Sequence, residues 1–524
     1  MRLKASFIGI LLVSLCILGL NIHGISIYAL DEAKNAECAR EMFEQGEWIV
    51  PTFNYELRTD KPPLHYYAMI LAFKAFGVNE FSARIFSVLM GGLCIALAWW
   101  FAHTYINRET GWWTAIVLWA SLHFSIQFHM AVPDPYLIFA MTLSLLSFYG
   151  FFMDRRPLFW WGIYIGMSMG ILAKGPVAIA IPGLIMFLFL ISQRSLDWKT
   201  ILAFRPLGGI LLVLGICLPW YILVGMETDW EWTRSFFLVH NVGRFTATME
   251  GHGGSFLLTF AYVGLGMLPF SVFLFQAIGT AYRERRIQPL LSFSLLGMLG
   301  FIGFFAISST KLPNYTVPSY PFFAIVLAYF LADTQRRAER MGRGAHLTYA
   351  IYTLLMAGLL VGAYLGIQGE KSIADLTYLA AWFLVLPVGA IAAWGQAVQK
   401  RYAQSYYSML ASWLIAAFAF YYLVFPKIDK ENAVMATLSL FEEETPVAYY
   451  KNANPAYSFY LQKPIKQLHS SDEVQPYLKA HPNALLIARK RTFHELDSVM
   501  TYQVLATKRD LFESPTTVVV KEME

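Results

Sequence analysis

The stretch YALDEAKNAECAREMFEQGEW, residues 28–48, decides the fold, because it begins where an apolar segment from about Leu3 to Tyr28 stops. Two carboxylates, Asp31 and Glu32, therefore stand at the edge of a segment of membrane-spanning length. The segment is longer than the apolar core of a secretory signal peptide, has no convincing cleavage site and is followed by many similar segments. We interpret it as a retained membrane span.

The composition indicates a polytopic membrane protein. Of the 524 residues, 57% are hydrophobic and only 14% are charged, whereas soluble domains carry about a quarter charged residues. The net charge of +5 is small for this length and gives no reason to expect a nucleic-acid partner. Three of the four cysteines lie in apolar segments, so no disulfide framework can be drawn.

Runs of about 20 apolar residues, the length that crosses a bilayer as a helix, predict about thirteen spans. They lie near 3–27, 81–102, 112–128, 135–153, 157–173, 176–192, 206–226, 255–280, 289–308, 314–332, 346–367, 375–396 and 405–425. Lys and Arg gather in alternate loops, so the positive-inside rule predicts a cytoplasmic amino terminus and an extracytoplasmic carboxyl terminus in the cytoplasmic (inner) membrane. No internal repeat is visible.

After Phe425 the chain becomes rich in Lys, Glu and Asp. Short β-like runs at 447–450, 484–488, 502–507 and 516–520 alternate with helix-like stretches at 431–443 and 492–500. This pattern predicts a small α/β domain. We therefore divide the chain into a membrane domain, 1–426, with a first outer loop at 28–80, and an extracytoplasmic domain, 427–524.

The first outer loop predicts a helix over 31–45, with Gly46 just past its end. One interpretation is that Asp31 caps this helix and Glu32 complements its dipole. Further on, TDKPPLHYY (59–67) places Asp60 and Lys61 before a proline pair, and Pro63 can begin the next helix. Lys61 then lies near a helix amino end, where anions are favoured; the alternative is a rigid turn with a solvated lysine.

The two stretches of the first outer loop, taken together, indicate a protein family more specifically than either stretch does alone. LDEAKNAECAREMFEQGEWIVPTFN, followed by DKPPLHYY, resembles the first outer loop of the lipid-linked-sugar glycosyltransferases with the C-type membrane fold, in particular the bacterial aminoarabinose lipid A transferases and their protein mannosyltransferase relatives. ILAKGPVAIAIP (171–182) and STKLPNYTVPSYP (309–321) extend the resemblance over the membrane region. Family members often have Arg-Tyr in place of Lys34 and Asn35, and Glu in place of Asp60.

The resemblance implies an inverting transfer of a sugar from a polyprenyl (undecaprenyl) phosphate to an acceptor outside the cytoplasmic membrane. A phosphate leaves without a proton, so one base and several cations suffice; the base must reach the acceptor hydroxyl, and the cations must face the charge on the phosphate. Asp31 is the expected base and Asp134 in AVPDPY a second acidic candidate. The expected phosphate-binding residues are Lys61, Arg244, Lys174, Lys311 and Tyr315, with Glu32, Lys34 and Asp60 completing the active-site loop.

Other interpretations remain open for several of these residues. Lys174 and Lys311 can extend to the membrane interface without a site, and Asp134 can belong to an ordinary Asp-Pro turn. His240 and His252 leave a divalent metal possible, although no further ligands can be identified and no cofactor is certain. No P-loop is found, and a lipid-linked donor needs no ATP.

The expected fold is a polytopic α-helical membrane protein of the C-type glycosyltransferase architecture with a small carboxyl-terminal α/β domain. A transporter or flippase is the main alternative, but such proteins place ionisable residues at the bilayer midplane, whereas here charges gather at span ends. A scaffold whose tail recruits partners is a third. The acceptor can be lipid A, a surface glycan or a protein; the expected partners are the donor, the acceptor and membrane lipids, and the chain is expected to be a monomer.

Overall fold

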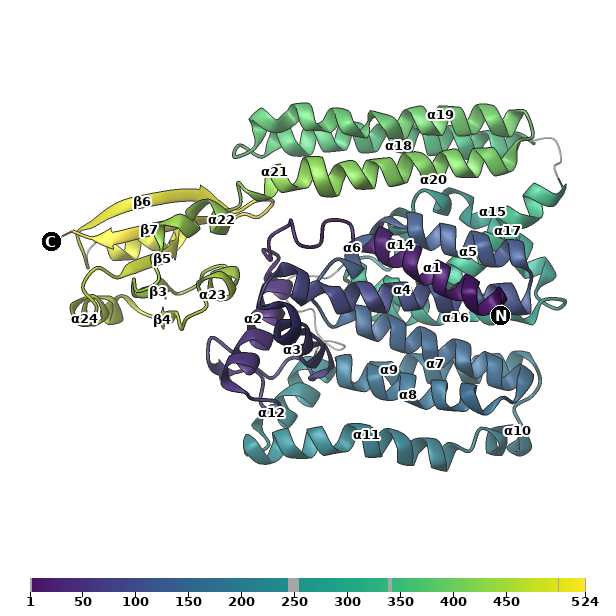
Figure 1. Cartoon of the computed structure of the whole chain (residues 1–524), viewed down its shortest axis with the longest axis horizontal. Helices are drawn as coiled ribbons and strands as arrows, with labels where there is room; N and C mark the ends of the chain where they lie inside the picture. The colour runs from purple at the N-terminus through teal and green to yellow at the C-terminus, as the bar shows by residue number, and fades with distance from the viewer. Residues whose placement is uncertain (1, 244–253, 338–341, 498, 524) are drawn as a thin grey trace.

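The computed structural model describes residues 2–243, 254–337, 342–497 and 499–523. Long helices run side by side, and a small sheet domain lies at one end of them (Figure 1). The amino terminus lies at the opposite end of the helices from the sheet, where the chain finishes. The first half of the bundle comprises α1 (Arg2–Leu18), α4 (Glu80–Tyr105), α5 (Arg108–Ala120), α6 (Leu122–Phe128), α7 (Asp134–Asp154), α8 (Pro157–Lys174), α9 (Val177–Ser192), α10 (Trp198–Ala203), α11 (Pro206–Glu227), α12 (Glu231–Arg234) and η1 (Ser235–Gly243).

The second half contains the long helices α18, α19 and α20, which form a layer along one side of the bundle (Figure 1). Its elements are α14 (Leu257–Gly266), η2 (Phe270–Phe273), α15 (Leu274–Glu284), α16 (Pro289–Ile307), η3 (Pro313–Ser319), α17 (Tyr320–Arg337), α18 (Arg343–Gly369), η4 (Ala374–Leu384), α19 (Val385–Val398), α20 (Tyr402–Ala419), η5 (Phe420–Val424) and α21 (Phe425–Asp429).

Eight helices among the described residues are long and apolar enough to cross a membrane, and three shorter apolar helices accompany them. The chain is therefore a multi-pass membrane protein. The predicted number of about thirteen spans is not confirmed, although each of the thirteen apolar runs is at least partly helical.

The spans that fall short are broken by local structure that apolar length does not reveal. The first helix, predicted to reach residue 27, ends at Leu18, and the chain beyond it is held by Arg84, which donates to the carbonyl oxygens of Ile22, Ile25 and Ser26. The run at 112–128 divides at Ser121 into α5 and α6. The run at 255–280 likewise divides into α14, η2 and α15.

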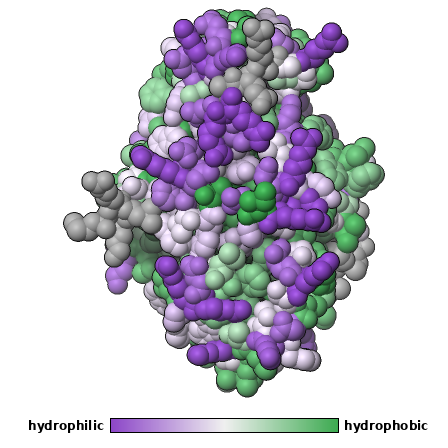
Figure 2. Space-filling view, turned by 90° about the vertical axis from the view of Figure 1, so that its right-hand side faces the viewer, coloured by the Kyte–Doolittle hydropathy of each residue, from purple (hydrophilic) through white to green (hydrophobic). Residues whose placement is uncertain are grey.

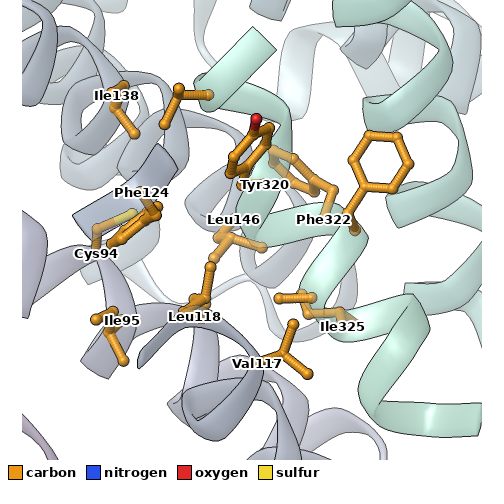
Figure 3. Packing of buried hydrophobic residues seen from close by; sticks show 14 of the residues in the cluster. Cys94, Ile95, Val117, Leu118, Phe124, Ile138, Leu146, Tyr320, Phe322 and Ile325 are labelled. Atoms are coloured by element: carbon orange, nitrogen blue, oxygen red, sulfur yellow. The ribbon is translucent and has the colours of Figure 1, made fainter. Parts of the chain in front are cut away.

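The core of the bundle lies where α4, α5, α7 and α17 meet (Figure 3). Cys94, Leu118, Ile138 and Ile325 are fully buried there. α11 and α18 bury a much smaller share of their residues. Their exposed apolar side chains suit a lipid environment, in which outward-facing leucine and isoleucine side chains have no water to avoid.

The first outer loop contains the predicted helix, most of which is buried. α2 (Leu30–Gln45) is followed by Gly46, whose φ of 69° is the left-handed conformation expected at a helix end. A two-stranded hairpin follows, β1 (Thr52–Phe53) and β2 (Glu56–Leu57), and then α3 (Leu64–Phe76). Pro63 stands immediately before α3 rather than in its first turn.

The tail contains the predicted sheet, with strand order β4-β3-β5-β7-β6. β3 pairs in parallel with β4 and β5, whereas β7 pairs antiparallel with β5 and β6. The division of the chain at 426/427 stays a prediction. The elements are α22 (Ala433–Thr437), η6 (Leu438–Leu440), β3 (Val447–Tyr450), α23 (Ala456–Leu461), β4 (Lys466–Leu468), η7 (Ser471–Glu473), α24 (Val474–Ala480), β5 (Leu485–Arg489), α25 (Lys490–Phe493), η8 (His494–Leu496), β6 (Tyr502–Arg509) and β7 (Thr516–Glu522).

Polar contacts join the tail to the first outer loop and to the segment just before it. The Asp429 carboxylate accepts hydrogen bonds from the backbone N–H and the hydroxyl of Ser26, both at 2.7 Å. The Asn54 side chain, in the hairpin, donates to the carbonyl of Ile465 and accepts from its N–H. The hairpin and the tail are thus held together where they enclose the candidate site.

The opposite end of the molecule is strongly polar. Figure 2 views the end at which α1 begins, and hydrophilic residues spread across much of that face. The side chains of Arg156 and Arg337 are 66% and 56% exposed. This distribution agrees with the loop charges that predicted a cytoplasmic amino terminus.

Candidate functional site

An inner cavity of about 240 Å³ lies between the first outer loop and the ends of the bundle helices. Its polar lining consists of Asp60, Lys61, Asp134, Lys174, His240, Asn241, Ser308, Asn314 and Tyr315, and its apolar lining of Leu137, Met141, Pro176, Val177, Ala180, Phe236, Phe304, Phe305 and Pro318. A cavity divided in this way suits an amphiphile with a charged head and an apolar body.

Lys61 enters this cavity from a charged cluster that fixes its surroundings. The lysine is only 4% exposed, and its Nζ lies 3.4 Å from Asp60 Oδ2. Arg58 pairs with both oxygens of Asp60, at 2.5 and 3.1 Å. Burial alone would raise the pKa of Asp60, but the charges of Arg58 and Lys61 hold it well below its usual range. Asp60 is therefore ionised and unsuited to abstract a proton.

A second charged pair also lines the cavity. Lys174, at the end of α8, donates to Asp134 Oδ1 at 2.7 Å, and Asn314 Nδ2 donates to the same oxygen at 3.1 Å. The ammonium group also lies 5.5 Å from the centre of the Tyr315 ring. Lys174 is thus held among these three side chains and does not simply extend to the membrane interface.

An outer cavity of about 650 Å³ lies between the first outer loop and the tail. Asp60 and His240 line both cavities, so the two meet at these side chains. The outer cavity has an amide-rich lining on the tail side. It includes Asn452, Asn454, Gln467 and Arg489 from the tail, and Leu30, Lys34, Asn54, Arg58 and Thr59 from the first outer loop.

Asp31 and Glu32 are adjacent in sequence but have different surroundings in the structure. Asp31 is exposed in the first turn of α2, and Ala29, not Asp31, occupies the cap position. Asp31 does not line either cavity among the described residues, although its neighbours Leu30 and Lys34 line the outer one. Glu32 points the other way: it is 3% exposed and is bound by Arg84 at 2.7 and 2.9 Å and by the N–H of Ala131.

The remaining predicted residues fall outside the two linings or outside the described chain. Lys311 donates to the carbonyl oxygen of Ser308, a lining residue, at 2.7 Å, but does not itself line the inner cavity in the described part of the chain. Arg244 and His252 lie outside the described residues. No group of three or more His, Cys, Asp or Glu side chains gathers within the described ranges, and the divalent metal stays a sequence-based possibility.

Sequence reasoning missed two residues that organise the site. Arg58, which is 7% exposed, holds Asp60, and its carbonyl oxygen accepts from the Trp232 indole at 2.8 Å. Asn314 binds Asp134. Asn314 lies inside the quoted STKLPNYTVPSYP motif, so the resemblance could have singled it out, whereas no local pattern distinguished Arg58 from a solvated arginine.

Comparisons with known proteins agree with the resemblance. Residues 60–223 match the family model described as dolichyl-phosphate-mannose-protein mannosyltransferase. The chain is 29% identical over 406 residues to the undecaprenyl phosphate-alpha-4-amino-4-deoxy-L-arabinose arabinosyl transferase of Pseudomonas paraeruginosa, which covers 76% of this chain and 72% of that protein. A protein of Aquifex aeolicus is 29% identical over 312 residues, 59% of this chain and 61% of its own length.

Solved structures share the fold. The crystal structure of ArnT from Cupriavidus metallidurans bound to undecaprenyl phosphate superimposes with a TM-score of 0.78 at 22% identity, covering 99% of this chain and 98% of that one. The oligosaccharyltransferase of Archaeoglobus fulgidus superimposes with a TM-score of 0.52 at 11% identity, covering 93% and 70%.

The comparisons confirm the predicted resemblance to the membrane glycosyltransferases with the C-type fold, and they support the predicted transferase class. Within that class, the relatives that this chain is similar to are aminoarabinose transferases and protein mannosyltransferases.

Proposed function

We propose that this chain transfers a sugar from a polyprenyl phosphate, most simply undecaprenyl phosphate, to an acceptor outside the cytoplasmic membrane, such as lipid A. The inner cavity carries the proposal, because two lysines line it together with aromatic and aliphatic side chains. The proposed donor follows from the relatives, whose names include undecaprenyl phosphate.

The phosphate of the donor lies against Lys61, with Lys174 and Tyr315 also lining the cavity. Each lysine already has a carboxylate partner, so the cavity is not a bare cluster of cations. Asp60 and Asp134 hold the lysines in place, and the dianion that forms on the leaving phosphate draws on their N–H donors. Preorganised donors of this kind are each worth about 3 to 4 kcal/mol in the transition state.

The transfer step needs one base. The acceptor hydroxyl oxygen forms a bond to the anomeric carbon, the bond from that carbon to the phosphate oxygen breaks, and the polyprenyl phosphate leaves with the electron pair. Asp31 takes the acceptor proton. Because Asp31 lies beside Leu30 and Lys34, the acceptor reaches it from the side of the outer cavity, and backside attack inverts the anomeric centre.

The test uses purified protein in detergent, with the sugar-labelled undecaprenyl phosphate-α-4-amino-4-deoxy-L-arabinose and lipid A. The wild type transfers label, Lys61→Ala loses donor binding and raises KM for the donor at least tenfold, and Asp31→Asn lowers kcat at least a hundredfold with little change in donor binding. Lys199→Ala, exposed on α10 at the opposite end of the bundle, serves as the lysine control and keeps more than half of the activity.

The base assignment, the phosphate contact and the acceptor can each be refuted separately. Normal turnover by Asp31→Asn removes the base assignment, and an unchanged donor KM in Lys61→Ala removes the phosphate contact. If lipid A accepts no sugar, mass spectrometry of envelope lipids, glycans and proteins from cells with and without the gene identifies whether a glycan or a protein is the acceptor. A transporter or flippase would release no sugar from the donor.

A further inference from the structure

Asn35 lies one helical turn after Asp31 and is fully buried. Its side-chain oxygen accepts from Arg58 at 3.2 Å, His65 Nε2 at 3.0 Å and the Tyr66 hydroxyl at 3.4 Å. Its Nδ2 donates to the backbone oxygen of Asp31 at 2.7 Å. A buried amide with this many partners is a structural junction, because a buried polar group without partners is costly.

The orientation of this amide follows from its surroundings. The guanidinium of Arg58 and the hydroxyl of Tyr66 can donate, so the oxygen must face them, and the carbonyl of Asp31 requires the nitrogen. Burial and the charges of Arg58 and Lys61 lower the pKa of His65, which is therefore neutral. Its Nε2 carries the proton, since Asn35 offers only an acceptor there.

The contacts lead from Asn35 to the cavity in three steps. Asn35 binds Arg58, Arg58 binds Asp60, and Asp60 lies 3.4 Å from the ammonium group of Lys61. Arg58 also donates to the carbonyl of Lys34 on α2. Without the Asn35 side chain, the guanidinium would still bond to the Lys34 carbonyl and to Asp60. It would lose its third acceptor and could rotate away from its present position.

We propose that Asn35 is a positioning residue: its side-chain oxygen fixes the Arg58 guanidinium. The guanidinium in turn holds Asp60 and Lys61 in place where the two cavities meet. Asn35 itself lines neither cavity among the described residues and does not touch the substrate. The consequence for donor binding rests on the proposed function, whereas the placement of Lys61 does not.

The first test needs no substrate. The purified full-length protein is treated briefly with acetic anhydride, and acetylation of individual lysines is followed by peptide mass spectrometry. In Asn35→Leu, which matches the shape but offers no acceptor, Lys61 is acetylated at least threefold faster than in the wild type. In Asn35→Asp, which keeps the acceptor oxygen, the rate stays within twofold.

Matched controls separate positioning from general loosening. Lys74 is exposed on the neighbouring α3 and keeps its rate in every variant. Met42→Ala, which removes another buried side chain from α2, leaves Lys61 as slow as in the wild type. An unchanged Lys61 rate in Asn35→Leu overturns the proposal, and so does equal acceleration in Asn35→Asp or in Met42→Ala.

The second test measures the dissociation constant for undecaprenyl phosphate in detergent. Asn35→Leu weakens binding at least tenfold in the wild-type background and by less than twofold when Lys61 is already alanine, because Asn35 acts through that lysine. Equal weakening in both backgrounds overturns the coupling to Lys61. If the wild type itself does not bind undecaprenyl phosphate, the proposed donor is wrong, and the acetylation result still decides the role of Asn35.

Discussion

Burial separates Glu32 from Asp31, although the two carboxylates are adjacent in sequence. Glu32 accepts two bonds from Arg84 and one from the N–H of Ala131, and Arg84 in turn binds three carbonyl oxygens of the chain after α1. Glu32 thus joins α2, α4 and the segment between α1 and α2. The sequence predicted Glu32 as an active-site loop residue. In the structure, its side chain holds these segments together.

Replacing Glu32 by Gln leaves the Arg84 charge buried without its partner. Breaking a buried ion pair in this way costs about 3 to 5 kcal/mol, so we expect Glu32→Gln to lower the thermal unfolding midpoint in detergent substantially. Glu32→Gln combined with Arg84→Met removes both charges and recovers part of the loss. A single variant as stable as the wild type would contradict the structural role.

Glu41 is a buried carboxyl group at the centre of the same helix. Thr52 Oγ1 and the N–H of Tyr55 donate to one of its oxygens, whereas the other has no partner, and Glu37 lies one turn away. Burial, with a further contribution from Glu37, raises its pKa to about 7 despite these donors. The folded protein therefore keeps this proton to higher pH than the unfolded chain does.

The raised pKa of Glu41 makes the folded protein less stable as the pH rises. Below the unfolded pKa, near 4.5, Glu41 is protonated in both states and has no effect. As the pH rises from 4.5 through 7, folding increasingly opposes ionisation, and stability falls by roughly 3 kcal/mol before levelling off. Glu41→Gln removes this loss, so its unfolding midpoint changes less between pH 5 and pH 8 than that of the wild type.

Glu44→Gln is the matched control for this experiment. Glu44 pairs with Arg40 on the same helix, but its side chain is 51% exposed, and such a pair is worth at most about 1 kcal/mol. Its pH profile should follow that of the wild type. A Glu41→Gln profile as steep as the wild-type profile would show that Glu41 is not the group responsible.

Helices and strands with local start or stop signals were predictable, and those interrupted by tertiary contacts were not. α2 begins and ends within one residue of the prediction, and β3 spans the predicted residues. The apolar runs at 112–128 and 255–280 gave no sign of their breaks, because at Leu122 the backbone N–H pairs with the carbonyl of Leu268 on another element. Such a partner cannot be read from a local pattern.

The same difference applies to the site. Lys61 and Lys174 were predictable because they belong to motifs that carry the resemblance, and the structure brings them to one cavity with Asp134, the second acidic candidate. Arg58 and the role of Asn35 were not, since their importance comes from contacts between α2 and the chain after β2. Tail residues such as Asn454 are separated from the loop by about four hundred positions and meet it only in the fold.

The hairpin β1–β2 is joined to the tail by the side chain of Asn54. Asn54 exchanges two hydrogen bonds with the backbone of Ile465, at 2.8 and 3.0 Å. Each is worth about 1 kcal/mol, so Asn54→Ala should release the tail locally. We expect faster hydrogen exchange at Ile465 and Lys466, with an unchanged rate in the long helices of the bundle.

Gln503→Ala provides the comparison, because Gln503 is exposed on β6, the far strand of the sheet. It should leave exchange at Ile465 unchanged. If Asn54→Ala and Gln503→Ala behave alike, the hairpin does not hold the tail, and other contacts hold it instead, such as the packing of α2 against α23 and the bonds between Ser26 and Asp429.

The molecule as a whole has two unlike ends, and their order in the membrane decides which substrates it can meet. Both cavities and the sheet lie at one end, while the polar face of Figure 2 lies at the other. Lys and Arg are retained on the cytoplasmic side. We therefore expect the cavities to face away from the cytoplasm, where a lipid-linked donor and an envelope acceptor can meet.

Cysteine labelling in cells tests this orientation. Phe512, in the tail, and Trp198, on α10 at the opposite end, are 62% and 78% exposed. In a Cys16→Ser background, which removes the one exposed cysteine of the described chain, a membrane-impermeant maleimide should label Phe512→Cys in intact spheroplasts. It should label Trp198→Cys only after the membrane is permeabilised. The reverse pattern would place Asp31 and Lys61 in the cytosol, where a donor carried on the outer leaflet cannot reach them.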